Sequence, residues 1–126
     1  MEYEELTHEI IACAYKVHNT LGAGFLEKVY ENALIIELGK AGLNVEQQFS
    51  IPVFYENQKV GDYYADLLVE KEIIIELKAV ENMVKKHEIQ LVNYLAGTGL
   101  DVGLLINFGT SVEVKRKYRV YKKNKN

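Results

Sequence analysis

The segment Ile73–Val80, IIIELKAV, constrains the fold more than any other part of the chain. Its composition predicts a strand, and successive side chains of a strand point to opposite faces of the sheet. Because Ile73 to Ile75 and Leu77 leave neither face polar, the strand needs cover on both sides, as in sheets that lie between other layers. Glu76 and Lys78 are therefore charged residues in a setting where burial should exclude charge.

The hydrophobic pattern elsewhere predicts three helices and further strands. Apolar residues recur at steps of three and four from Leu6 to Leu21, which predicts a first helix. A second should begin after Gly24 and end near Gly39, with a stripe formed by Leu26, Val29, Tyr30, Ala33, Leu34 and Leu38. A third is expected over 85–96, packing through Ile89, Val92 and Leu95. Strands are expected over 45–55, 60–69, 73–80, 101–107 and 111–121.

Length and composition predict one domain over residues 1–121, followed by a frayed basic tail at 122–126. No stretch approaches the roughly 20 apolar residues that cross a bilayer. The acidic start MEYEEL lacks the basic region of a signal peptide, so we expect a cytoplasmic protein that does not bind a membrane. The single cysteine, Cys13, lies on the apolar side of the first helix and is expected to pack in the core.

Charge is distributed unevenly along the chain. Seven of the 15 basic residues lie between Lys115 and Lys125, where there is no acid, so the net charge of −3 conceals a balance of −10 over the first 114 residues. A basic tail on an acidic body could add affinity for phosphate, although a solvated terminal tail is the simpler interpretation.

Asp66, Glu76 and Lys78 form the candidate site. Glu76 and Lys78 are two residues apart and project from the same strand face. If the intervening turn is centred near Lys71, Asp66 lies opposite Glu76, with Cβ atoms ~5 Å apart. Two carboxylates at that distance call for a cation between them. The pattern alone leaves two alternatives open, a metal site or a salt-bridged structural cluster.

Helices on either side of these strands contribute further candidates. Glu27 stands in the first turn of the second helix, where a carboxylate can also serve the helix dipole, and Tyr30 lies one turn further. On the third helix His87, Gln90 and Tyr94 form one polar stripe. His87 has no second histidine or cysteine at zinc spacing, so the pattern gives zinc little support.

Several motifs in order resemble the GxxExxY protein family, which is placed in the PD-(D/E)XK nuclease-like superfamily. They are GFLEKVY at 24–30, DYYADL at 62–67, IELKAV at 75–80, HEIQLVNYL at 87–95 and GLLINF at 103–108. The resemblance implies a prokaryotic protein of the α/β class with a restriction-endonuclease-like core. In that core a mixed central β-sheet is flanked by helices in the order ααβββαββ.

The resemblance also implies roles for individual residues. Asp66 and Glu76, with the main-chain carbonyl of Leu77 and with Glu27, would hold Mg²⁺, for which Mn²⁺ could substitute. Lys78 would position the attacking water. The pattern departs from the superfamily motif at Ala65, where that motif has proline.

On the third helix the resemblance matches Gln90 and Tyr94 to a glutamine and tyrosine of the RecB-like branch. Gln90 is thus expected in the catalytic set, and Tyr30, Tyr94 and His87 at the substrate. The functional hypothesis is a Mg²⁺-dependent nuclease that acts on DNA rather than RNA, with a homodimer as one possible assembly. The alternatives are a non-catalytic nucleic-acid- or protein-binding module on the same fold, and a structural partner with a buried ion pair.

Overall fold

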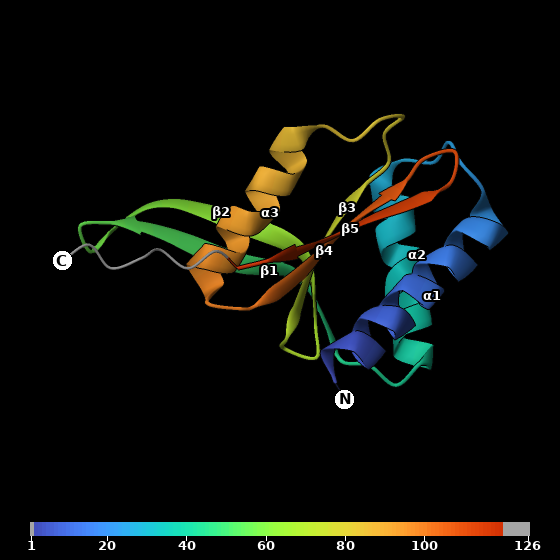
Figure 1. Cartoon of the computed structure of the whole chain (residues 1–126), viewed down its shortest axis with the longest axis horizontal. Coiled ribbons are helices and arrows are strands. Elements are labelled where there is room, and N and C mark those ends of the chain that lie inside the picture. The colour runs from blue at the N-terminus through green and yellow to red at the C-terminus, as the bar shows by residue number, and fades with distance from the viewer. Residues whose placement is uncertain (1, 120–126) are drawn as a thin grey trace.

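The computed structural model describes residues 2–119 and confirms the predicted order of elements (Figure 1). The elements are α1 (Tyr3–Leu21), α2 (Glu27–Lys40), β1 (Val45–Tyr55), β2 (Gln58–Val69), β3 (Ile73–Lys78), α3 (Lys85–Thr98), β4 (Val102–Phe108) and β5 (Val112–Tyr118). The bounds differ from the expected ones by about two residues in several places: β3 ends at Lys78, β2 begins at Gln58 and α3 ends at Thr98. Val120, Tyr121 and the predicted basic tail at 122–126 lie outside the described residues.

The five strands form one mixed sheet in the order β1-β2-β3-β4-β5. The pair β3–β4 is parallel and the other three pairs are antiparallel. Parallel neighbours require a crossover connection, and α3 supplies it. The carboxyl end of β3 therefore lies at the sheet edge from which the chain leaves for α3.

Helices cover both faces of the sheet, which explains the apolar character of β3. The helices α1 and α2 pack on one face with Leu67, Ile75 and Leu77, while α3 packs on the other with Leu68 and Ile74. The free thiol of Cys13 is buried against α2 in the first of these layers, as predicted. Within residues 2–119, no helix is both long enough and apolar enough to span a bilayer.

The buried faces of two helices differ from those predicted. On α3 the core residues are Leu91, Tyr94 and Leu95, whereas Ile89 is 52% exposed. The helix is thus turned so that Tyr94 packs toward the sheet with the leucines, while His87 and Gln90 are half-buried. On α2 the predicted stripe begins too early, because Leu26 and Val29 are exposed while Tyr30, Leu34 and Leu38 are buried.

Close approach between α3 and the sheet depends on a glycine in β4. A Cβ atom built on Gly103 would lie 2.8 Å from Cδ1 of Leu91 and 3.3 Å from the carbonyl oxygen of Ile74. Real Cβ contacts are not that short, so a larger residue there would push the helix away. Gly103 therefore sets the depth at which α3 sits, and with it the position of the side chains that α3 presents to β3.

Strands β1 and β2 continue well past the rest of the sheet. Their pairing extends from Val45 opposite Val69 to Tyr55 opposite Gln58, whereas β2 pairs with β3 only over 67–69. The turn residues Glu56 and Asn57 both have positive φ, as in the tight turns that suit twisted hairpins. We call residues 49–65 the hairpin arm. Figure 1 shows it projecting beyond β3 alongside α3.

Candidate functional site

Asp66 and Glu76 face each other at the point where β2 and β3 diverge. The last paired residues are Leu67 and Ile75, and the same register places Asp66 opposite Glu76, as predicted. Beyond Leu67 and Ile75, hydrogen bonds from main-chain N–H groups to the two carboxylates join the strands. The N–H of Leu77 donates to Oδ2 of Asp66 at 2.7 Å, and the N–H of Asp66 donates to Oε1 of Glu76 at 3.0 Å. Both side chains are thus held in defined orientations by the opposite strand.

Burial and mutual repulsion make this pair costly to ionise. Glu76 is 5% exposed, and burial, followed by the charge of Asp66, raises its pKa to about 8. Burial also raises the pKa of Asp66, although the hydrogen bond from Leu77 opposes that change. Adjacent carboxylates whose pKa values are raised in this way are characteristic of functional sites, where a proton or a cation relieves the repulsion.

Glu27 and Lys78 complete the charged cluster. Glu27 is the first residue of α2. Burial raises its pKa, the charge of Asp66 adds to that rise, and the charge of Lys78 opposes it. The charge of the Lys78 ammonium likewise opposes the rise in the pKa of Asp66 and of Glu76, so one lysine acts on all three acids. The fold therefore brings together the four charged residues that the sequence predicted.

A neighbouring side chain fixes the end of β3. Asn107 on β4 is 2% exposed, pairs with Lys78 across the parallel ladder and bonds the main chain of Val80 twice. Its Oδ1 accepts from the Val80 N–H at 3.0 Å, and its Nδ2 donates to the Val80 carbonyl at 2.9 Å. These bonds hold the chain immediately after Lys78.

A fourth acid, Glu31, was recognised only in the structure. It is 2% exposed and accepts hydrogen bonds from Lys28 at 2.9 Å, from Gln47 at 2.5 Å and from Gln48 at 3.2 Å. Its charge adds to the raised pKa of Asp66. The sequence offered one indication of this role: Glu31 follows Glu27 by four residues, which puts both carboxylates on one face of α2.

Gln48 links this buried acid to the site. Its neighbours Gln47 and Phe49 pair with Leu67 and Ala65, so Gln48 lies opposite Asp66. It interrupts the strand with φ of 54°, a conformation that non-glycine residues rarely adopt. Burial raises the pKa of Asp66, and a hydrogen bond from the Gln48 side chain opposes that rise. Backbone strain of this kind concentrates at functional sites.

The polar stripe of α3 meets the site from the other side. Tyr94 is 6% exposed, and burial together with the charges of Glu76 and Asp66 raises its pKa to about 12. Burial, with the charge of Lys78 second, lowers the pKa of His87, whose Nδ1 is 3.5 Å from the Val84 N–H at the helix start. Gln90, which lies between His87 and Tyr94 on the helix, is half-buried.

Tyr30 does not lie with these residues at the site surface. It has no exposed area, and its ring stacks on Phe108 with centroids 4.6 Å apart. Its hydroxyl donates to the Gly22 carbonyl at 2.6 Å and accepts from the Phe25 N–H at 3.2 Å. The expectation that Tyr30 contacts substrate is therefore not supported, because the side chain ties the loop before α2 to the core.

The donor set suits a hard divalent cation. Asp66 and Glu76 present carboxylate oxygens, which Mg²⁺ prefers, and Mg²⁺ is commonly held by one or two carboxylates together with water. Within residues 2–119, no group of three or more acidic, histidine or cysteine side chains is gathered in a form that could hold a metal. Glu27 thus interacts with the pair electrostatically without completing a preformed ligand group.

Comparisons with known proteins agree with this geometry. The family model described as the PD-(D/E)XK nuclease superfamily matches residues 4–119. Together with the mixed sheet, that match confirms the restriction-endonuclease-like fold, while the narrower GxxExxY grouping stays a prediction. No curated protein matches the sequence. The crystal structure of SSO0001 superposes with a TM-score of 0.57 at 18% identity, a likeness that supports the fold alone. The superposition covers 75% of this chain and 50% of SSO0001, so the chain spans about half of that protein's length.

Proposed function

The chain belongs to the PD-(D/E)XK nuclease superfamily, and from that membership we propose that it is a Mg²⁺-dependent nuclease that hydrolyses DNA. The observation that carries the proposal is the opposed pair Asp66 and Glu76, each held by a hydrogen bond from the other strand, with Lys78 beside it. A purely structural ion pair would not require two buried acids to face each other.

Each side chain has a role that follows from its position. A divalent cation held by Asp66 and Glu76, with the Leu77 carbonyl, would polarise the scissile phosphate and stabilise charge on the leaving oxygen. Lys78 would hold the attacking water, as a compact ammonium is suited to do. Glu27, whose pKa is also raised, would accept a hydrogen bond from that water.

Side chains of α3 would orient the substrate. Gln90 offers amide donors to a phosphate oxygen, and Tyr94 lies close enough to Glu76 and Asp66 for their charges to shift its pKa. His87 stands nearest the end of β3, where the charge of Lys78 acts on it.

A cytoplasmic location belongs to the same proposal, as does a homodimer that would cut both strands of a duplex with two sites.

A cleavage panel tests the proposal. Labelled single-stranded, duplex and branched DNA, with RNA of the same sequence, are incubated with Mg²⁺, with Mn²⁺ and with a chelator. We expect metal-dependent cleavage of DNA that is lost in Asp66→Asn, Glu76→Ala and Lys78→Ala. Glu9→Gln on α1, an exposed acid beside the end of α2 opposite to Glu27, is the matched control and should cut as the wild type does.

Two results would contradict the proposal. Cleavage that survives both Asp66→Asn and Lys78→Ala would mean that another site or a contaminant is responsible. Absence of cleavage with either metal, accompanied by salt-sensitive DNA binding, would favour the alternative of a non-catalytic binding module.

A further inference from the structure

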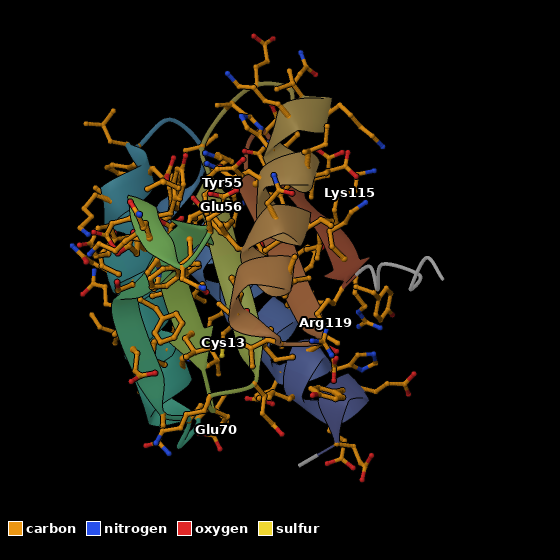
Figure 2. The ribbon with its side chains drawn as sticks, turned by 90° about the vertical axis from the view of Figure 1, so that its left-hand side faces the viewer. Cys13, Tyr55, Glu56, Glu70, Lys115 and Arg119 are labelled. Atoms are coloured by element: carbon orange, nitrogen blue, oxygen red, sulfur yellow. The ribbon has the colours of Figure 1, made fainter. Side chains whose placement is uncertain are left out.

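A groove runs beside the candidate active site, between α3 and the hairpin arm. Its volume is about 830 Å³, within the range of sites that bind small organic groups. One wall is the arm, with Ile51, Pro52, Val53, Phe54 and Tyr63. The other is α3, with Lys86, Ile89, Gln90, Asn93, Tyr94, Ala96 and Gly97. Figure 2 looks onto the tip of the arm, which carries Tyr55 and Glu56, and Figure 1 shows that this tip projects past α3.

Tyr94 connects the groove with the candidate carboxylates, which do not themselves line it. Tyr94 lines it and is also the residue of α3 on which the charges of Glu76 and Asp66 act. Across the groove from Tyr94 stands Tyr63, with ring centroids 5.9 Å apart and ring planes inclined by 44°. A molecule bound in the groove would therefore contact an aromatic pair, one ring of which is near the carboxylates.

Aromatic and apolar groups of the arm are open to solvent. Tyr63 is 49% exposed and Phe54 is 61% exposed, values that a core role does not explain. Exposed rings in a groove offer flat surfaces for stacking. Such surfaces suit the faces of nucleic-acid bases, because every base has a π face regardless of its sequence.

Charge in the groove differs from charge in the chain as a whole. The chain has 18 acidic residues and a net charge of −3, yet none of the described residues that line the groove is acidic. Lys86 is basic, and Gln90 and Asn93 carry amide donors suited to phosphate or to base edges. A polyanion would meet less repulsion here than over an average part of the surface.

We propose that this groove binds an unpaired DNA strand, with bases stacked on Tyr63 and Phe54 and the backbone directed toward Asp66 and Glu76. The inference rests on the proposed nuclease function and specifies its substrate. Paired bases are stacked on one another and do not offer their faces to side chains, so a groove built from exposed rings selects a single strand or a splayed end. A continuous duplex would leave Tyr63 and Phe54 without a partner.

Binding without cleavage tests this inference separately from the nuclease proposal. Fluorescence anisotropy in a chelator, with Asp66→Asn as the host, measures the affinity for a labelled 15-nucleotide DNA strand, its duplex and the RNA of the same sequence. We expect the DNA strand to bind more tightly than the duplex. In Tyr63→Ala and Phe54→Ala its affinity should fall by about 5- to 100-fold, the range expected for loss of one stacked base. Tyr63→Phe, which keeps the ring, should bind as the host does.

Tyr64→Ala is the matched control. Tyr64 follows Tyr63 on the same strand, is 53% exposed and does not line the groove, so its truncation removes a similar ring from the opposite face. Equal losses in Tyr63→Ala and Tyr64→Ala would overturn the inference, and so would tighter binding of the duplex. RNA bound more tightly than the DNA strand would overturn the choice of DNA as the ligand. Unchanged binding in Tyr63→Ala and Phe54→Ala would overturn the proposed stacking.

The two proposals fail in different ways. If strand binding depends on Tyr63 but the wild type cleaves with neither metal, the nuclease proposal is refuted and the groove proposal stands. If duplex DNA is cleaved and the cleavage is insensitive to Tyr63→Ala and Phe54→Ala, the groove proposal is refuted and the nuclease proposal stands. Thermal unfolding of each variant confirms that the exposed substitutions leave the fold intact.

Discussion

Replacing Glu76 by glutamine should stabilise the metal-free protein, and the gain should grow with pH. The pKa of Glu76 is raised from 4.5 to about 8 in the folded chain, chiefly by burial. Below pH 4.5 the group carries its proton in both the folded and the unfolded state, so it has no effect on stability there. As the pH rises, the unfolded state ionises first, and the free energy of unfolding falls by about 1.4 kcal/mol per pH unit.

The size of the effect follows from that interval. At pH 7 the loss amounts to about 3 kcal/mol, and above pH 8 it levels near 5 kcal/mol as the folded state ionises too. Both free energies are order-of-magnitude values derived from the pKa shift. They are a large part of the roughly 5–15 kcal/mol by which a typical domain is stable. Glu76→Gln does not ionise and keeps an oxygen to accept the Asp66 N–H. Relative to wild type, it should gain almost nothing at pH 4 and about 3 kcal/mol at pH 7.

Urea unfolding in a chelator, repeated at each unit from pH 4 to pH 8, measures this difference. The exposed acid Glu9 on α1 provides the control, because Glu9→Gln should show no gain that grows with pH. A gain for Glu76→Gln of equal size at pH 4 and pH 7 would refute the reasoning, as would destabilisation at pH 7. Adding Mg²⁺ should stabilise the wild type at pH 8 and leave Glu76→Gln little changed, since the cation replaces the proton on Glu76.

Two further changes test the packing that positions the site. Gly103→Ala should cost about 1–3 kcal/mol of unfolding free energy, because its Cβ would overlap Leu91. Gly39→Ala, at a helical position with open space around it, should instead gain about 0.5–1 kcal/mol in the same denaturation assay; similar losses in both would contradict the packing argument. Tyr30→Phe should cost about 1–3 kcal/mol by leaving the Gly22 carbonyl without its donor, and an unchanged unfolding midpoint would show that this bond does not stabilise the loop.

Much of the fold could be predicted because local pattern and global architecture agree. The apolar strand at 73–78 required cover on both faces, and the helices on either side of it in the sequence provide that cover. The pairing of Asp66 with Glu76 followed from a short turn, since a three-residue connection leaves little freedom of register. Periodicity failed on α3, where the apolar residue Ile89 is exposed and Tyr94 is buried. Periodicity reports which residues are apolar, whereas the buried face of a short helix also depends on what lies beneath it.

The sequence by itself determined the order of elements and brought Asp66, Glu76 and Lys78 to one strand pair, because strand alternation and turn length are local properties. Only the tertiary structure decided that Glu31 is buried and that Gln48 adopts a strained conformation opposite Asp66. It also decided that an arm of β1 and β2 faces α3 across an aromatic groove. These features join segments far apart in the chain, and their positions depend on how closely layers pack, as at Gly103. No spacing within one segment encodes that depth.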